Sequence, residues 1–324
     1  MKKPVIALAL ASAAALALAG CSSTPAAGEG DDSGLITVVA STNVYGALAA
    51  QIGGDRVEVT SIIDNAAKDP HSYEATARDR LTVQGADLVI ENGGGYDSFI
   101  DSLLADAQDP AVITAVEYSH DYPENEGHDE EEGEDHAHDH TEEEGHDHLE
   151  GFNEHVWFDP HTVSHVVEAI AAELTELDPD GQADFEAAAA ALNTEIEGFE
   201  GDLETLKAEA AGANVIITEP LPGYLAEAAG LTDVTPEGFA ESVEEGTDVA
   251  PATLLETLNV VESGDVAAVL TTAQTAGAET QKVQDAAEDA GIPVVAFSEL
   301  LDDGSSYSEW MSDAIQSLAA AVAP

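Results

Sequence analysis

The stretch Asp87-Leu88-Val89-Ile90-Glu91-Asn92-Gly93-Gly94-Gly95 shows the pattern on which the rest of the chain is built. A short apolar run bounded by turn residues is typical of a strand buried inside a sheet. The run opens onto three successive glycines, and a helical pattern follows at residues 96–107. A buried strand, a glycine turn and a helix form the repeating unit of parallel α/β architecture, so the stretch predicts an α/β fold.

The same alternation of short β-rich runs and amphipathic segments extends to both sides of this unit. Together these elements predict a first lobe over residues 35–178. Its strands are expected at residues 36–40, 57–63, 87–91 and 111–116, and its helices at 44–52, 74–84, 96–107 and 162–177.

A long helical pattern follows over residues 179–211. Its apolar residues recur at helical spacing and define one face: Phe185, Leu192, Ile196, Phe199, Leu203 and Leu206. A continuous helix of this length would reach about 45 Å. Gly198 and Gly201 each destabilise such a helix by roughly 1 kcal/mol relative to Ala. The sequence therefore leaves open whether the helix has a weak spot at these glycines. Because the pattern separates two α/β halves, we interpret it as a rigid connecting helix.

Residues 212–324 repeat the alternation and predict a second lobe. Its strands are expected at residues 215–218, 266–271 and 293–297, and its helices near 221–229, 251–262, 279–290 and 307–322. The expected fold is therefore α/β, with two lobes of parallel sheet flanked by helices and joined by one long helix. A mature chain of about 300 residues is more than one core usually accommodates, which agrees with two lobes.

A tract rich in histidine and acid covers residues 120–150, with fifteen Asp and Glu. Its dense like charge opposes folding, and Leu149 is its one large aliphatic residue after Pro123, so we expect a solvated loop. Imidazole and carboxylate are ligands of zinc and its neighbours, which predicts weak auxiliary metal sites; a charged linker without a ligand is the alternative. The histidines of the tract are His120, His128, His136, His138, His140, His146 and His148.

Residues 1–20 have the features of a secretory leader, with two lysines before an apolar run too short to span a bilayer. The leader ends in Leu18-Ala19-Gly20-Cys21, which resembles the lipobox of bacterial lipoproteins. Cys21 is the only cysteine, so no intrachain disulfide can form. We expect cleavage before Cys21, acylation of Cys21 as a lipid anchor, and a flexible tether over residues 21–34. A plain secretory signal with an incidental cysteine is the alternative.

The net charge excludes several partners. Once the leader is removed, six Lys and Arg face sixty-six Asp and Glu. Such a surface repels nucleic acid and free anionic membranes, and it concentrates cations. Adaptation to a salty or alkaline habitat is a second explanation for part of this charge.

Two histidines stand where α/β proteins bind ligands. His71 follows Pro70 in the loop after the strand at residues 57–63, at the C-terminal edge of the expected sheet. His155 lies between the acidic tract and the apolar Val156-Trp157-Phe158, which would bury against the sheet and fix the imidazole ring.

Two further histidines, His161 and His165, are spaced i,i+4 at the start of a helix. Such a pair can chelate a metal. Asp159-Pro160-His161 is equally typical of a helix N-terminus with histidines that face solvent. We favour the second interpretation.

Taken together, these features resemble a known family, the metal-binding solute-binding lipoproteins of ABC importers for zinc and manganese. Besides the lipobox, the resemblance spans residues 35–322 and includes the histidine-rich tract, the long helix and the strands of the second lobe. Its motifs are Asp69-Pro70-His71-Ser72-Tyr73-Glu74, Ala86-Asp87-Leu88-Val89-Ile90-Glu91-Asn92-Gly93 and His155-Val156-Trp157. The family implies two α/β lobes joined by one rigid helix, with a single metal in the cleft.

The resemblance also implies a ligand set. His71 and His155 match the first two ligands by position. Glu219, in Thr218-Glu219-Pro220, stands where many zinc-type relatives have histidine and manganese-type relatives have glutamate. A helix N-terminal carboxylate is the alternative role for Glu219. Glu299, in Phe297-Ser298-Glu299, stands where the family's last ligand is usually Asp.

Two points about this ligand set stay open. Asp302 and Asp303 lie close to Glu299 and are alternatives to it as the last ligand. In addition, Thr271-Thr272-Ala273-Gln274 stands where relatives often carry an acidic residue, which puts any supporting role there in doubt.

We therefore expect extracytoplasmic capture of Zn²⁺, with Mn²⁺ as the alternative, and delivery to an ABC permease. The protein is expected to be a monomer held at the membrane by the lipid on Cys21, with no nucleic-acid partner. A metal-dependent hydrolase is the competing class, but four protein ligands close the coordination sphere, and the common hydrolase motifs are absent. A surface metal buffer that uses the tract alone would not need two lobes. The sequence thus predicts a binding protein and not an enzyme.

Overall fold

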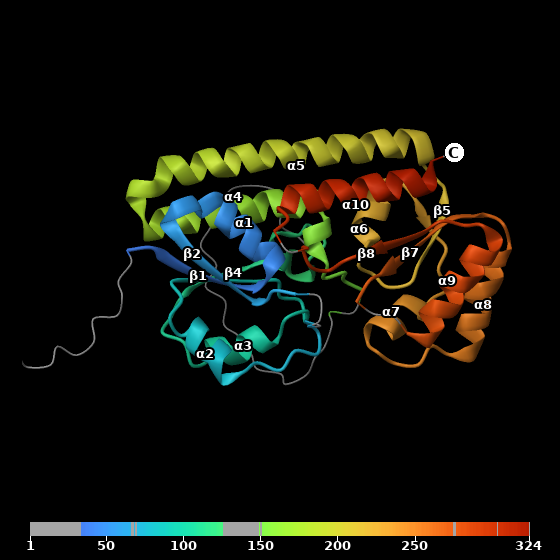
Figure 1. Cartoon of the computed structure of the whole chain (residues 1–324), viewed down its shortest axis with the longest axis horizontal. Helices are drawn as coiled ribbons and strands as arrows, with labels where there is room; N and C mark the ends of the chain where they lie inside the picture. The colour runs from blue at the N-terminus through green and yellow to red at the C-terminus, as the bar shows by residue number, and fades with distance from the viewer. Residues whose placement is uncertain are drawn as a thin grey trace, which may run out of the picture. The chain divides into compact units, whose positions relative to one another are not determined.

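Two four-stranded parallel sheets form the framework of the protein (Figure 1). The computed structural model describes residues 34–65, 68, 70–125, 149, 151–274, 277–302 and 304–323. The first sheet has the order β2-β1-β3-β4, and every neighbouring pair is parallel. Its strands are β1 (Ile36–Thr42), β2 (Val57–Ile63), β3 (Leu88–Glu91) and β4 (Ala111–Thr114). All four residues of β3 are buried, as expected for an inner strand of a parallel sheet.

The second sheet has the order β6-β5-β7-β8 and is also parallel throughout. Its strands are β5 (Asn214–Ile217), β6 (Thr232–Asp233), β7 (Val266–Thr272) and β8 (Val294–Phe297). The sequence pattern missed β6, because two residues are too few to show a strand period. The predicted fold class is otherwise confirmed.

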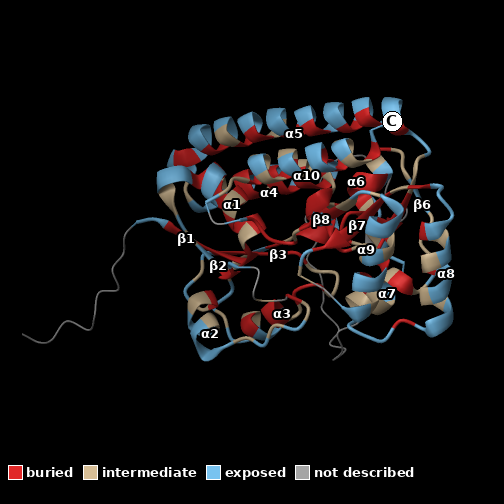
Figure 2. Cartoon of the chain, turned by 45° about the vertical axis from the view of Figure 1, so that its right-hand side comes forward, coloured by how far each residue is buried: buried red, intermediate tan, exposed pale blue. Residues whose placement is uncertain are grey.

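Helices cover both faces of each sheet (Figures 1 and 2). One shared core contains buried residues of both sheets and of the helices α1 (Asn43–Gly53), α4 (Pro160–Leu177), α5 (Gln182–Ala210), α6 (Gly223–Ala228) and α10 (Tyr307–Val322). The opposite face of the first sheet packs against α2 (Ala77–Val83) and α3 (Phe99–Leu104). The opposite face of the second sheet packs against α7 (Phe239–Glu244), α8 (Pro251–Glu262) and α9 (Ala278–Ala290).

Five short 3₁₀ turns connect these elements in the described part of the chain. They are η1 (Gly54–Arg56), η2 (Ala115–Tyr118), η3 (Pro123–Asn125), η4 (Val156–Phe158) and η5 (Pro179–Gly181). The long helix α5 begins directly after η5.

Helix α5 continues unbroken through Gly198 and Gly201, so the open question about these glycines is settled in favour of a continuous helix. Its buried face contains every residue that the helical spacing predicted. It contacts α1 and α4, which precede it in the sequence, and α6 and α10, which follow it. Figure 1 shows α5 running above these helices. Figure 2 shows its outer face exposed along its whole length.

Two predicted helices of the first half are shorter in the structure. Helix α2 begins only at Ala77, because the Thr76 hydroxyl and the Asp79 carboxylate form a capping box there. Helix α3 begins only at Phe99, after a loop that the Asp97 carboxylate holds by accepting hydrogen bonds from the main-chain N–H groups of Asn92 and Gly93.

The division into lobes stays a prediction. Residues 35–324 form one compact unit, in which a single core runs through both halves. The predicted boundaries at 35–178, 179–211 and 212–324 are therefore not tested. Residues 1–33, with the leader and Cys21, lie outside the described residues.

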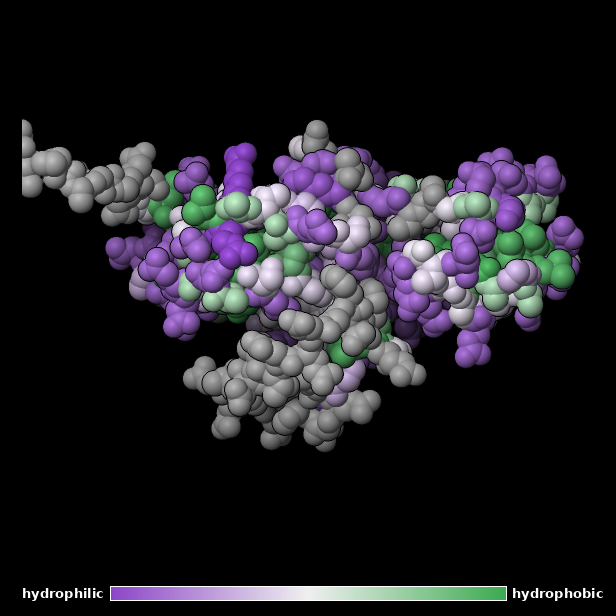
Figure 3. Space-filling view, turned by 90° about the horizontal axis from the view of Figure 1, so that it is seen from below, coloured by the Kyte–Doolittle hydropathy of each residue, from purple (hydrophilic) through white to green (hydrophobic). Residues whose placement is uncertain are grey.

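Hydrophilic side chains cover much of the face shown in Figure 3. The large apolar side chains that are exposed belong to different segments: Leu35, Leu81, Val112, Leu149, Leu177 and Leu255. None of the helices in the described ranges combines the length and the apolar character needed to cross a bilayer.

Candidate metal centre

The side chains of His71 and His155 come together in the structure. His71 lies in the turn between β2 and α2, directly after the buried Pro70, and His155 directly precedes η4. Their ring centroids are 6.0 Å apart. The ring of Tyr96 lies edge-on to both, at 4.8 Å from His71 and 5.9 Å from His155. The loops after β2 and β3 thus meet the segment before α4 at the carboxyl edge of the first sheet.

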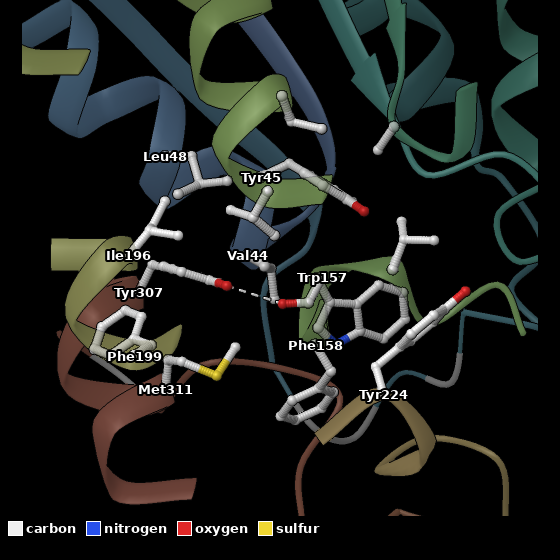
Figure 4. Packing of buried hydrophobic residues seen from close by; sticks show 14 of the residues in the cluster. Val44, Tyr45, Leu48, Trp157, Phe158, Ile196, Phe199, Tyr224, Tyr307 and Met311 are labelled. Carbon is white, nitrogen blue, oxygen red and sulfur yellow. Dashed lines mark hydrogen bonds between the residues drawn. The ribbon is translucent and has the colours of Figure 1, made fainter. Parts of the chain in front are cut away.

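Aromatic packing fixes the position of His155, as its sequence context predicted. His155 is fully buried, and its ring centroid lies 5.2 Å from that of Trp157. Trp157 in turn packs against Tyr96 at 4.5 Å. Figure 4 shows the Tyr307 hydroxyl donating a hydrogen bond of 3.0 Å to the main-chain oxygen of Trp157. Helix α10 therefore holds the segment that carries the histidine.

Asn153 sets the orientation of the His155 imidazole. Its Oδ1 lies 2.8 Å from Nδ1 of His155, while the Asn153 main-chain oxygen accepts a 2.7 Å hydrogen bond from the Tyr224 hydroxyl. A Cβ atom at Gly223 would lie 2.8 Å from Nδ2 of Asn153, so a larger residue there would require this amide to shift. With Nδ1 facing an acceptor, Nε2 is the nitrogen available to a metal.

Four glutamates lie around the two imidazoles. Glu154, Glu219 and Glu299 are at most 2% exposed, and the side chain of Glu244 is 7% exposed. Oε1 of Glu244 is 3.7 Å from Nε2 of His155, and Oε2 of Glu299 accepts a 3.2 Å hydrogen bond from the Tyr96 hydroxyl. One ligand atom from each of His71, Glu154, His155 and Glu244 lies within 4.8 Å of the other three.

The pKa of Glu244 reflects the other three carboxylates around it. Burial, followed by the charges of Glu154, Glu219 and Glu299, raises the pKa of Glu244 to about 9. So many acidic groups in a buried space repel one another unless a proton or a cation intervenes. Two imidazoles with carboxylates are the donor set of zinc and manganese sites, so the residues fit such an ion.

The predicted residues are brought together to different degrees. His71 and His155 are direct neighbours, whereas Glu219 and Glu299 lie close enough to influence Glu244. Glu299 is buried while Asp302 is exposed, which favours Glu299, and Asp303 lies outside the described residues.

Sequence reasoning missed Glu154 and Glu244. Glu154 directly precedes His155, and that adjacency was an available signal. Glu244 comes from α7, a six-residue helix that the pattern did not reveal. No motif marks Glu244 in the sequence.

The stretch Thr271-Thr272-Ala273-Gln274, which lacks an acidic residue, still supports the site. Oε1 of Gln274 accepts a 3.3 Å hydrogen bond from the main-chain N–H of Glu299, and its Nε2 donates one of 2.8 Å to the Ser298 hydroxyl. Thr271 accepts a 3.1 Å hydrogen bond from Gln284. Gln274 therefore holds the backbone of Glu299 without adding a charge.

The remaining histidines are exposed or lie outside the described part of the chain. His161 and His165 are exposed at the start of α4, where Asp159 caps the helix and Pro160 occupies its first position, as the favoured interpretation predicted. Their ring centroids are 4.8 Å apart, and His120 lies 6.3 Å from His161. The other tract histidines, from His128 to His148, belong to the residues that the structure does not describe.

A fold of two parallel sheets, with imidazoles and carboxylates converging at their carboxyl edges, defines the class of α/β binding proteins. The family model described as "ZnuA: Zinc-uptake complex component A periplasmic" matches residues 38–321. The chain belongs to this family, which is one of solute-binding proteins.

Two curated relatives are similar to the chain. The manganese-binding lipoprotein MntA of Halalkalibacterium halodurans is 28% identical over 257 residues, which cover 78% of this chain and 75% of MntA. The zinc-binding lipoprotein AdcA of Streptococcus pneumoniae serotype 4 is 28% identical over 244 residues, or 75% of this chain. That match spans only 46% of AdcA, so the chain corresponds to about half of that protein.

The fold also matches solved structures. The periplasmic zinc-binding protein TroA from Treponema pallidum superposes with a TM-score of 0.69 at 20% identity, covering 90% of this chain and all of TroA. At that identity the match establishes the fold alone.

Proposed function

We propose that the protein captures a divalent transition metal outside the cytoplasmic membrane and passes it to an ABC-type permease. The observation that carries the proposal is the convergence of the imidazoles of His71 and His155 with buried carboxylates. Membership of a zinc-uptake family supports it, as do relatives that are named metal-binding lipoproteins.

The proposed ligands are His71, His155, Glu219 and Glu299. The two histidines come from the first half of the chain, and the two glutamates follow β5 and β8 of the second half. A metal bound by this set would connect the carboxyl edges of the two sheets. Four protein ligands fill the position that a catalytic zinc site keeps open for water, which suits capture and opposes catalysis.

Zinc is the first candidate for the metal. The Irving–Williams order gives Zn²⁺ a higher affinity than Mn²⁺ for almost any site of nitrogen and oxygen ligands. A tract with seven histidines is also suited to collecting zinc.

Manganese is the second candidate, and a specific observation favours it. Four carboxylates surround two imidazoles, and carboxylate-rich sites suit the harder Mn²⁺. The relative MntA is named as manganese-binding.

The protein would act at the outer surface of the membrane as a monomer, without nucleic-acid partners. Acylation of Cys21 would hold it close to the permease. Replacing Cys21 with Ala should release the protein from the membrane fraction and abolish lipid labelling. Retention of labelled Cys21→Ala protein would contradict the anchor.

Competition titration tests the metal assignment. Protein lacking residues 1–21 is freed of metal, and zinc and manganese are offered at equal free concentrations against a chelator of known affinity. A single tight site that prefers zinc supports the first candidate. A preference for manganese selects the second, and the absence of a tight site refutes metal capture.

A further inference from the structure

We propose that Glu244 is an additional ligand of the captured metal, supplied by α7 of the second half. This inference rests on the proposed function, because it assigns a further residue to the same site. Glu244 is the last residue of α7 and lies far in sequence from both histidines.

The distance between Glu244 and His155 fits a shared ion. Oε1 of Glu244 and Nε2 of His155 are 3.7 Å apart. Two metal–ligand bonds of about 2.1 Å span that distance at an angle of roughly 120°, close to the angles of four- and five-coordinate zinc. A direct hydrogen bond would bring the two atoms closer, to about 3 Å. The spacing therefore suits a bridging cation better than a direct contact.

Burial leaves the Glu244 carboxylate in need of a partner. Its side chain is 7% exposed, and among the described residues Oε1 accepts no hydrogen bond. The histidine is its one ion-pair partner within these residues. A buried carboxylate oxygen without a donor costs free energy, and a metal bond removes that cost.

The charges around Glu244 also call for a cation. Glu154, Glu219 and Glu299 all act on it electrostatically. Glu244 stands in addition at the C-terminal end of α7, where the helix presents its negative pole. A divalent ion relieves both kinds of repulsion at once, and it does so more strongly than a neutral water molecule.

The fold holds Glu244 in this place. Phe239 at the start of α7 is fully buried in the core on the outer face of the second sheet. Gly238 precedes it with φ 78°, a left-handed conformation that glycine adopts without strain, and its carbonyl accepts a 2.6 Å hydrogen bond from the Ser242 hydroxyl. The helix is therefore fixed at its beginning, and its end is directed at His155.

Substitution of Glu244 in the full mature chain tests the proposal, with zinc and manganese as probes. At less than one equivalent of metal only the tight site is filled, so the tract does not interfere. Glu244→Gln keeps the size of the side chain and removes its charge. We expect the affinity for zinc to fall at least about tenfold, and the affinity for manganese to fall further, since a neutral amide is a poor ligand for a hard ion.

Glu244→His and Glu245→Gln complete the experiment. Glu244→His should retain tight zinc binding and reject manganese, a change in selectivity that a purely structural role would not produce. Glu245→Gln removes the neighbouring exposed charge and should leave both affinities unchanged.

The outcomes separate this inference from the proposed function. If the native chain binds metal tightly and loses it on His155→Ala, while Glu244→Gln binds equally or more tightly, then Glu244 is not a ligand and the proposed function stands. A native chain without a tight site refutes the proposed function itself.

Discussion

The side-chain amide of Asn153 donates a 3.0 Å hydrogen bond to the main-chain oxygen of Pro220, which directly follows Glu219. Because Nδ2 is used in this bond, Oδ1 faces Nδ1 of His155. One amide thus connects an imidazole of the first half to the loop that carries a carboxylate of the second half. It also directs Nε2 of His155 toward Glu244.

This geometry makes Asn153 a positioning residue. Asn153→Ala should lower metal affinity by about 10- to 100-fold, the usual effect of removing a group that orients a metal-binding histidine. Asn153→Asp keeps an acceptor for Nδ1 and should restore most of the affinity. Competition titration with a chelator measures both.

The matched control for Asn153 is Asn259→Ala, which removes an exposed amide from α8. It should bind metal like the native chain. If Asn153→Asp binds as weakly as Asn153→Ala, the acceptor of Nδ1 is not what matters, and the link to Pro220 would explain the loss instead.

His71 and His155 should be essential for tight binding. His71→Ala or His155→Ala should lower the affinity by more than about 100-fold, because each removes a nitrogen ligand outright. His161→Ala removes an exposed imidazole and should leave the tight site unchanged. Isothermal titration at low metal loading distinguishes these cases, and equal binding by all three variants would contradict the proposed site.

Glu219 should tune the choice of metal. Glu219→His supplies a third imidazole, which softens the donor set. We expect the variant to retain zinc and to discriminate against manganese more strongly than the native chain. The ratio of the two dissociation constants measures this change, and a ratio that does not move would place Glu219 outside the ligand set.

Physical reasons explain which parts of this protein were predictable. The strands and the long helix follow from periodic apolar residues, and β2 and the buried face of α5 agree with the prediction residue by residue. Strand β6 and helix α7 are too short to show a period in the sequence. The position of Glu244 at the site could therefore not be predicted. The role of Gln274 depends on an amide that meets the backbone of Glu299, and no sequence spacing encodes that contact.

The acidic tract should be dispensable for the tight site. The structure defines where a deletion can begin, because the ring of Tyr122 packs 5.6 Å from that of Phe152, and Nδ2 of Asn125 donates to the main-chain oxygens of Glu117 and Ser119. Removing residues 126–148 and joining the ends with a short glycine-serine linker should remove most of the weak binding and keep one tight site.

Equilibrium dialysis at increasing zinc concentration counts these sites. The matched control replaces the same residues with a linker of equal length that lacks histidine and acid, which tests the effect of chain length alone. Loss of the tight site in both forms would mean that the tract itself supplies its ligands.

A buried carboxylate away from the metal centre should control how stability depends on pH. Glu91, at the end of β3, is 8% exposed and accepts a 2.8 Å hydrogen bond from the Thr114 hydroxyl. Burial, together with the charges of Asp97 and Asp101, raises its pKa from 4.5 to about 8. The folded protein therefore keeps a proton on Glu91 that the unfolded chain releases.

Because the folded-state pKa is the higher one, the contribution of Glu91 to stability is fully present below pH 4.5 and is lost as the pH rises through about 8. Glu91→Gln imitates the protonated acid at every pH and keeps an acceptor for Thr114. The variant should match the native chain near pH 4.5 and exceed its free energy of unfolding by about 2–4 kcal/mol at pH 8. Urea unfolding of metal-free protein at several pH values measures the difference, with Glu204→Gln on the exposed face of α5 as control. A difference that is the same at pH 5 and pH 8 would show that packing, and not ionisation of Glu91, causes the effect.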